Sequence, residues 1–187
     1  MALHDLARKL TYEDYALFPE DGQRHEIIDG EHYVSPAPTL PHQDLVVELT
    51  LRVGGFVKAH RLGRFLIAPT DVLLSVHDIV QPDLFFISNE RAAIAQEKNV
   101  QGAPDLVIEI LSKGTLRLDK GPKLKAYERC GVWEYWIFDR FQRGVLPWKR
   151  SGASLRPQPF LSAAAGDVLT TPLLPGFELP LAEIFES

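Results

Sequence analysis

The most restrictive feature of this 187-residue sequence is a glutamate inside an apolar run. Glu109 interrupts the segment 106–111, whose other members are Leu, Val or Ile. Continuous apolar runs of this length are typical of strands that are covered on both faces. Because side chains alternate along a strand, Glu109 shares one face with Asp105, Val107 and Leu111 and is expected to lie under a covering layer. A buried carboxylate is unfavourable by several kcal/mol unless a cation, hydrogen-bond donors or a metal compensates it.

Other segments predict the elements around that strand. Short apolar segments bounded by Pro, Asp or Gly predict further strands at 65–68, 71–76, 84–87 and 133–138. The pair Asp29-Gly30 predicts the turn of a hairpin over 24–35. Apolar spacing predicts a long helix over 42–61, weakened at Gly54-Gly55 and capped by His42, and two shorter helices at 11–19 and 119–129. We expect Asp119 to cap the last helix and Gly131 to end it.

We therefore expect one α/β domain over residues 1–187. A central mixed sheet lies between helices in a core over about 10–140, and extra β-hairpins form a C-terminal extension over about 141–187. The apolar fraction of 45% supports a sizeable core, and the charged fraction of 24% excludes membrane and disordered classes. No segment resembles a signal peptide or a membrane span. The single cysteine, Cys130, excludes an intrachain disulfide and fits a cytoplasmic protein.

A second acid beside a predicted strand suggests a metal site. Asp83 directly precedes the apolar segment 84–87, so it is a second acid next to a predicted strand. Mg²⁺ takes oxygen ligands, often one or two carboxylates with several waters, so two such acids are what a magnesium site needs. The alternatives are that Asp83 ends a strand at the surface and that Glu109 pairs with an arginine.

A basic stretch follows the acidic strand directly. Residues 113–129 contain six Lys or Arg and two Asp or Glu, a local balance of +4 in a chain whose net charge is −5. Lys120, Lys123 and Tyr127 share one helical face at three- and four-residue spacing. A lysine beside a metal-bound water or a phosphate supplies charge where a phosphoryl transition state is negative. The alternative is a solvated helix face.

These residues carry a family resemblance. The blocks Glu26-Ile27-Ile28-Asp29-Gly30-Glu31, Gln81-Pro82-Asp83-Leu84 and 103–112, followed by Asp119, Lys123, Tyr127 and Glu134-Tyr135-Trp136, resemble the Uma-type endonuclease family. That family belongs to the PD-(D/E)XK, restriction-endonuclease-like superfamily, and the resemblance covers roughly residues 10–139. It implies a restriction-endonuclease-like α/β/α core whose acids bind a divalent metal.

The resemblance also implies roles for single residues. Asp83 corresponds to the aspartate of the first half-motif and Glu109 to the acid of the second, and Glu26 to an acid that the superfamily often supplies from its first element. Asp83, Glu109 and the main-chain carbonyl of Ile110 would then hold Mg²⁺, for which Mn²⁺ could substitute. A surface position in the hairpin is the alternative for Glu26.

The catalytic lysine departs from the simple motif. The position two residues after Glu109 is Leu111, so the resemblance indicates Lys123 on the following helix. Lys113 is the competing candidate, because it has the strand parity of Glu109 if the strand extends that far. Lys113 and Gly114 also replace the proline and serine that are usual in the family.

The remaining candidates are residues beside the two acids. We expect substrate contacts from Gln81, Ser112, Lys113, Lys120 and Tyr127. His42 could touch substrate instead of capping a helix, and Asp71 could support the site or form a turn. Asp105, which also follows a proline, lies roughly 13 Å along the strand from Glu109 and is rejected as a metal ligand. Trp133, Tyr135 and Trp136 are expected to pack in the core.

The expected activity is metal-dependent hydrolysis of DNA phosphodiester bonds. The first alternative is a catalytically inactive nuclease-fold module that binds nucleic acid or protein. The second is a metal phosphohydrolase with a small substrate, which leaves the basic stretch less explained. A nuclease that cuts both strands gains from two-fold pairing, so a homodimer is an open expectation. No base-reading motif is present, and specificity for a DNA sequence is left open.

Overall fold

A seven-stranded mixed sheet between two helical layers forms the centre of the molecule. The computed structural model describes residues 8–112 and 114–185. The strand order is β11-β10-β9-β8-β6-β3, with β12 also paired to β10. Only β8 and β9 run parallel; the other pairs in this sheet are antiparallel. The strands are β3 (Gly63–Ile67), β6 (Leu84–Ser88), β8 (Leu106–Ile110), β9 (Glu134–Asp139), β10 (Gly144–Ser151), β11 (Ser154–Pro157) and β12 (Leu161–Ser162).

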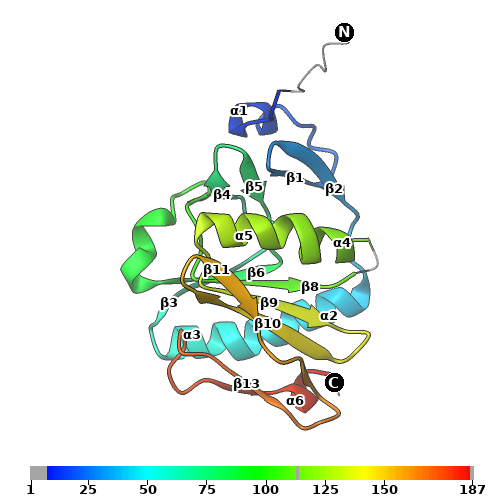
Figure 1. Cartoon of the computed structure of the whole chain (residues 1–187), viewed down its shortest axis with the longest axis vertical. Helices are drawn as coiled ribbons and strands as arrows, with labels where there is room; N and C mark the ends of the chain where they lie inside the picture. Colours follow the sequence, from blue (N-terminus) through cyan, green and yellow to red (C-terminus); the bar gives the residue numbers. More distant parts are fainter. Residues whose placement is uncertain (1–7, 113, 186–187) are drawn as a thin grey trace.

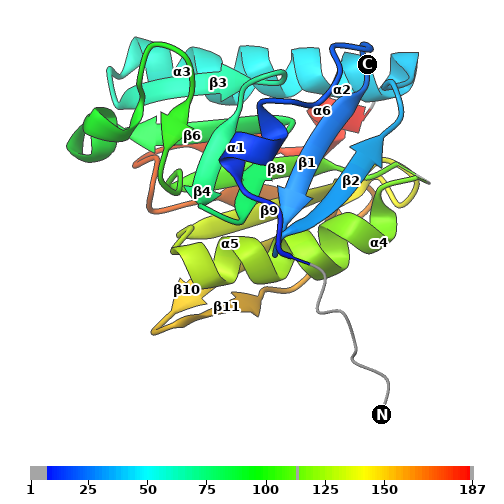
Figure 2. The same ribbon diagram turned by 90° about the horizontal axis from the view of Figure 1, so that it is seen from above.

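Two bent helices cover the two faces of this sheet (Figures 1 and 2). One consists of α2 (Leu40–Leu49), a π-helical turn η1 (Thr50–Gly54) and α3 (Gly55–Ala59). The other consists of α4 (Leu116–Leu118), a second π-helical turn η3 (Asp119–Lys123) and α5 (Leu124–Cys130). This arrangement confirms the restriction-endonuclease-like α/β/α core that the resemblance implies. None of the helices in residues 8–112 and 114–185 is long and apolar enough to cross a membrane.

The alternation of β8 decides which side of the sheet holds Glu109. Leu106, Ile108 and Ile110 belong to the apolar core that contains the buried residues of α2 and α3. Val107 belongs to the other core, together with buried residues of α5. The face assignment from the sequence is therefore confirmed, and Glu109 lies beneath η3 and α5.

The predicted weak point of the long helix is the π-helical turn η1. Gly54 ends that turn where the helix crosses β3. A Cβ atom at position 54 would lie 2.8 Å from Cδ1 of Phe65, closer than side-chain carbons approach. The glycine therefore permits this close approach of helix and strand.

A second sheet lies beside the central one and carries the expected hairpin. Its order is β2-β1-β5-β4-β7. Asp29 and Gly30 connect β1 to β2 with φ angles of 53° and 80°, as a tight hairpin turn requires. The strands are β1 (Arg24–Ile28), β2 (Glu31–Ser35), β4 (Val72–Ser75), β5 (Asp78–Val80) and β7 (Val100–Gln101).

The remaining elements are short. The first helix, α1 (Tyr12–Tyr15), begins after the capping box of Thr11. A 3-10 helix, η2 (Asn89–Ile94), follows β6. The C-terminal segment adds the hairpin of β13 (Val168–Thr170) and β14 (Glu178–Pro180) and the helix α6 (Leu181–Phe185), which pack against the core on the α2 side.

Four local predictions were wrong. The helix predicted over 11–19 ends at Tyr15. The helix predicted to begin at Asp119 begins at Leu116, and Asp119 is a buried residue of η3 rather than a cap. The helix predicted to begin at His42 begins at Leu40, because proline is favoured in a first turn and Pro41 extends the helix toward Thr39. Trp133 was expected in the core but is 51% exposed; it lies just before β9, whose six residues are all buried. Gly131 does end α5, with a φ of 93°.

Candidate active site

Strand register brings the two predicted acids together. In the antiparallel pair of β6 and β8, Leu84 lies opposite Ile108, so Asp83 reaches the level of Glu109. The Asp83 N–H donates to Oε2 of Glu109 at 3.3 Å. The Ile110 N–H donates to Oδ2 of Asp83 at 2.9 Å. The start of β6 and the end of β8 therefore form one site from residues that are 26 positions apart.

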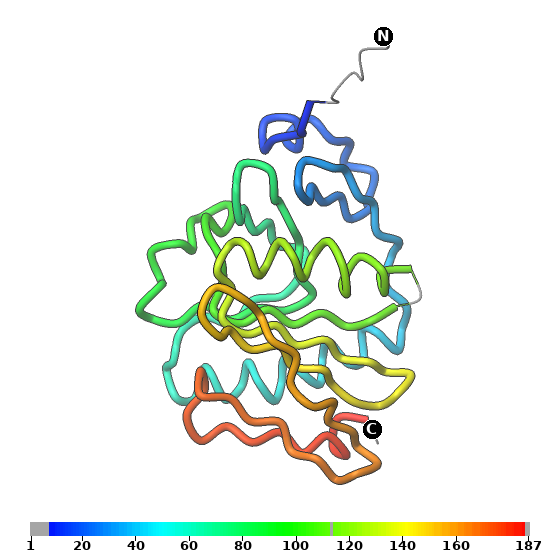
Figure 3. Tube along the Cα trace, in the orientation of Figure 1, coloured from blue at the N-terminus to red at the C-terminus, as the bar shows by residue number. Residues whose placement is uncertain are grey.

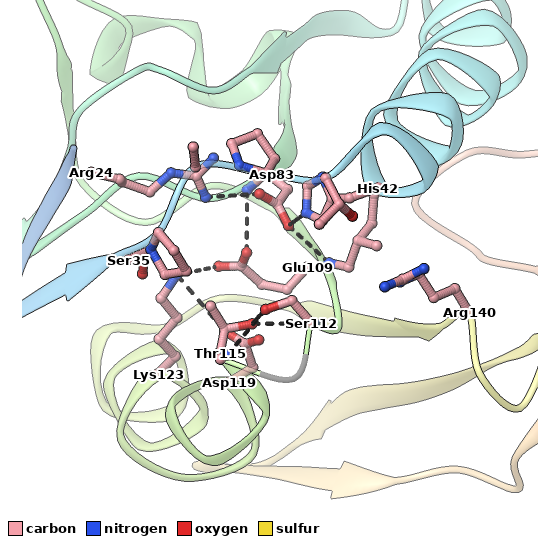
Figure 4. A pocket seen from close by; sticks show the side chains of 16 residues that line it. Arg24, Ser35, His42, Asp83, Glu109, Ser112, Thr115, Asp119, Lys123 and Arg140 are labelled. Atoms are coloured by element: carbon pink, nitrogen blue, oxygen red, sulfur yellow. Dashed lines mark hydrogen bonds and ion pairs between the residues drawn. The ribbon is translucent and has the colours of Figure 1, made fainter. Parts of the chain in front are cut away.

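The covering helix adds a buried lysine to these acids (Figure 4). The Lys123 Nζ lies 2.9 Å from Oε1 of Glu109 and 2.9 Å from Oε1 of Glu26. Oδ1 of Asp119, one helical turn earlier, lies 3.9 Å away. Tyr127, one turn later, donates its hydroxyl to Oε1 of Glu109 at 2.8 Å. Four-residue spacing thus places Asp119, Lys123 and Tyr127 on the side that faces β8.

Two basic side chains hold the oxygens of Asp83. Arg24, the first residue of β1, donates from a terminal guanidinium nitrogen to Oδ1 at 2.8 Å. Nε2 of His42, in the first turn of α2, lies 3.1 Å from Oδ2. The His42 Nδ1 is buried without a hydrogen-bond partner in the described part of the chain. Asp83 is therefore fixed from the hairpin and from the long helix.

The two acids have opposite electrostatic environments. Burial raises the pKa of Glu109 to about 8; the charge of Lys123 opposes this rise, and the nearby charges of Asp83, Asp119 and Glu26 add to it. Burial also acts to raise the pKa of Asp83, but the hydrogen bond from His42 and the charge of Arg24 hold it well below its usual range. The two carboxylates therefore differ in proton affinity although they are neighbours.

Burial and the neighbouring charges also shift the pKa values of Asp119 and Lys123 on the helix. Burial raises the pKa of Asp119 to about 6, against the charge of Lys123. Burial disfavours the charged form of Lys123, but the carboxylates, Glu109 first, outweigh burial and raise its pKa. Lys123 is therefore a fixed cation in the site.

These groups meet at a pocket of about 280 Å³ (Figure 4). Its walls come from the end of β8, the start of the helix over 116–130, the segment 35–39 and the first turn of α2. Its charged lining residues are Arg24, His42, Asp83, Glu109, Asp119, Lys123 and Arg140.

The donor chemistry of the site fits a hard divalent cation. The carboxylates of Glu26, Asp83, Glu109 and Asp119 face the paired cations Arg24 and Lys123, which leaves an excess of two negative formal charges. Oε2 of Glu26 and Oδ1 of Asp119 are buried without a hydrogen-bond partner in the described residues. Within residues 8–112 and 114–185, no three His, Cys, Asp or Glu side chains have the arrangement of a metal site. A cation would therefore rely on few carboxylates, with main-chain oxygen and water, as Mg²⁺ commonly does.

The predicted substrate-contacting residues are distributed around this centre. Ser112 lines the pocket, and its hydroxyl lies 3.0 Å from that of Thr115. Tyr127 is fully buried, and its hydroxyl binds Glu109. Lys120 is exposed and outside the pocket lining. Lys113 lies outside the described residues.

Gln81 contacts Glu26, and Asp71 contacts Gln81. The Gln81 main-chain N–H donates to Oε1 of Glu26 at 2.8 Å. The Gln81 side-chain amide donates to Oδ1 of Asp71 and to the Tyr15 hydroxyl, so α1 is connected to the site. Asp105, the rejected acid, accepts from the Ser88 N–H and lies outside the pocket lining.

Sequence reasoning missed Arg24, Asp119 and Arg140 as residues of the site. Asp119 precedes Lys123 by one helical turn, so its spacing could have revealed it. Arg24 precedes Glu26 by two residues on a strand, so alternation puts both on one face. Arg140 follows β9, and no sequence pattern relates it to the acids.

Comparison with known proteins agrees with this architecture. A family model, Uma2, described as "Putative restriction endonuclease", matches residues 12–182. A crystal structure described as a putative nuclease belonging to DUF820 from Anabaena variabilis matches with a TM-score of 0.76 at 18% sequence identity. The alignment covers 95% of this chain and 98% of that chain. No curated protein matches the chain. The family match spans most of the sequence, and the chain therefore belongs to the Uma2 family.

Proposed function

We propose that this protein is a metal-dependent endonuclease that hydrolyses phosphodiester bonds in DNA. The observation that carries the proposal is the joining of Asp83 and Glu109 at one pocket, with Lys123 bonded to Glu109. Membership of a family whose model is described as "Putative restriction endonuclease" supports the reaction class. The carboxylates of Asp83, Glu109 and Asp119 at the pocket support a role for a divalent cation, because phosphate and carboxylate otherwise repel each other.

Asp83, Glu109 and the main-chain carbonyl of Ile110 would hold Mg²⁺ or Mn²⁺, with Glu26 as a further acid. When bound, such a cation lowers the pKa of a water molecule and polarises a phosphate. The chain's own groups prepare the acids for this role. Tyr127 and Lys123 fix one oxygen of Glu109, and Arg24 and His42 fix the carboxylate of Asp83.

Lys123 has a second role in the proposed reaction. Its ammonium group is held between Glu109 and Glu26 at the wall of the pocket. A fixed charge at that place stabilises the negative charge that develops on a phosphate during hydrolysis. Lys113 remains the competing lysine, and Ser112 and Lys120 remain candidates for contacts to the DNA backbone.

Nicking of supercoiled plasmid tests the proposal. Wild type should nick DNA with Mg²⁺ or Mn²⁺ and stop in EDTA. Glu109→Gln keeps the size of the side chain and should lower the rate by roughly a hundredfold or more. Asp105→Asn is the matched control, because Asp105 has the same strand parity but lies outside the pocket. Equal nicking by wild type and Glu109→Gln would refute the assignment.

The lysine assignment needs its own pair of variants. Lys123→Ala should abolish nicking with Mn²⁺, whereas Lys113→Ala should retain it. Calorimetric titration with Mn²⁺ adds a readout without substrate, and the uptake should weaken in Asp83→Ala and Glu109→Ala. The reverse result for the two lysines would move the role to Lys113.

A module that binds nucleic acid without cleaving it is the second candidate. The observation in its favour is that Arg24 and His42 already occupy both oxygens of Asp83. In that case, fluorescence anisotropy would detect DNA binding that does not depend on Mn²⁺, and no preparation would nick plasmid. Homodimer formation stays a prediction that light scattering can test, and a cytoplasmic location stays a prediction from the sequence.

A further inference from the structure

Three long cationic side chains line the pocket, and two of them are paired. Arg24 binds Asp83, and Lys123 binds Glu109 and Glu26. Arg140 has no hydrogen bond and no ion pair with any described residue, and its Nε is buried without an acceptor. Buried donors are normally satisfied, so an unsatisfied one at a pocket wall marks a place for an acceptor that is not part of the chain.

The turn after β9 holds Arg140 in place. Oδ1 of Asp139 accepts from the N–H groups of Phe141 and Gln142, both at 3.0 Å, which fixes the backbone on either side of residue 140. The guanidinium carbon of Arg140 lies 4.4 Å from the centre of the Phe141 ring. Figure 4 shows the side chain pointing from the end of β9 toward the pocket, on the side of Glu109 away from Arg24.

The acids of the pocket explain why a substrate phosphate would need Arg140. Asp83, Glu109 and Asp119 line the pocket and would repel an approaching phosphodiester. Arg24 and Lys123 offset those acids, so neither is free to offset the substrate's own charge. Arginine presents a planar fork of donors that matches two oxygens of a phosphate.

We propose that Arg140 is the phosphate-docking residue of the pocket, which binds the non-bridging oxygens of a substrate phosphodiester. This inference rests on the proposed function for the identity of the substrate, but it does not depend on a metal. The bound phosphate would lie between Arg140 on one side and Asp83 and Glu109 on the other.

Binding of a fluorescein-labelled 12-nucleotide DNA in EDTA tests this role without any turnover. Arg140→Gln should raise Kd about tenfold or more, because hydrogen bonds to charged groups contribute on that scale. Arg140→Lys should bind with an intermediate Kd, since lysine keeps the charge and loses the fork. Arg156→Gln is the matched control, because Arg156 is exposed on β11 and outside the pocket.

A second readout reports on Arg140 itself. In a ¹H–¹⁵N spectrum, the signal that disappears in Arg140→Lys identifies the Arg140 Nε–H group, and this signal should shift when inorganic phosphate is added. Thermal melting of Arg140→Gln close to that of wild type excludes unfolding as the cause of weak binding.

The outcomes separate this inference from the proposed function. Equal Kd values for wild type and Arg140→Gln, or no detectable DNA binding by wild type in EDTA, would overturn the role of Arg140 even if plasmid is nicked. Binding that depends on Arg140, together with nicking that does not depend on Glu109, would instead overturn the proposed function and leave the docking role intact.

Discussion

Replacing Lys123 by methionine should destabilise the whole protein. Lys123 is 1% exposed, and its two nearest carboxylates, Glu26 and Glu109, are 0% and 2% exposed. Each is 2.9 Å from Nζ. Methionine fills a similar volume but leaves both carboxylates without their cation. Breaking a buried ion pair in this way costs about 3–5 kcal/mol, which is a large part of the stability of a typical domain.

Urea unfolding followed by circular dichroism measures this loss in the free energy of unfolding. In a thermal melt of a chain of this length, the same loss lowers the melting temperature by roughly 6–20 °C. Lys125→Met is the matched control, because Lys125 lies on the same helix and is exposed, so its stability should stay within about 0.5 kcal/mol of wild type.

A double variant tests the cause of the loss. Lys123→Met with Glu26→Gln removes a cation and an anion together, so it should be less destabilised than the sum of the two single variants by about 0.5–3 kcal/mol. If Lys123→Met unfolds within 1 kcal/mol of wild type, or if the single losses simply add, the carboxylates do not depend on Lys123 and the electrostatic reasoning is refuted.

Two further predictions concern residues outside the pocket. Asp78 is buried; burial acts to raise its pKa, but hydrogen bonds, including one from Arg129, lower it below the usual value. The stabilising effect of the Asp78 carboxylate is therefore complete above about pH 4 and is lost as the pH falls toward the folded pKa. In urea unfolding, Asp78→Asn should be less stable than wild type at pH 7 and should differ less from wild type at pH 3. Gly131→Ala should lose about 1 kcal/mol because of the φ of 93°, whereas Gly121→Ala, where a Cβ meets open space, should not lose stability; equal effects would contradict the role of φ.

Sequence patterns predicted the parts of the fold that local physics controls. Period-two alternation correctly assigned the two faces of β8, and the Asp-Gly pair correctly placed the turn between β1 and β2. Glu109 was recognisable because a charge is unusual in an apolar strand. Asp83 needed the resemblance to the Uma-type family in addition, since an aspartate at the start of a strand is common.

The contacts that the sequence did not reveal depend on tertiary packing. Arg24 and His42 meet Asp83 only after a hairpin and a helix from other parts of the chain pack against β6. Asp119 looked like a helix cap because nothing local shows that the helix begins one turn earlier, at Leu116. No sequence pattern marks Arg140, because its position at the pocket depends on how β9 packs in the folded chain.

The antiparallel register of β6 and β8 determines where the sequence can change without moving the two acids. Asp83 and Glu109 are placed by the main-chain pairing of β6 with β8, and the connecting residues 89–104 are not partners in that register. That connection contributes residues 95–100 to a separate hollow of about 460 Å³, which Gln81 also lines. Insertions or substitutions at exposed positions such as Glu97 and Lys98 can therefore remodel a surface near the acids without moving them. The surface around this hollow and the positions of Asp83 and Glu109 are therefore set by different parts of the chain.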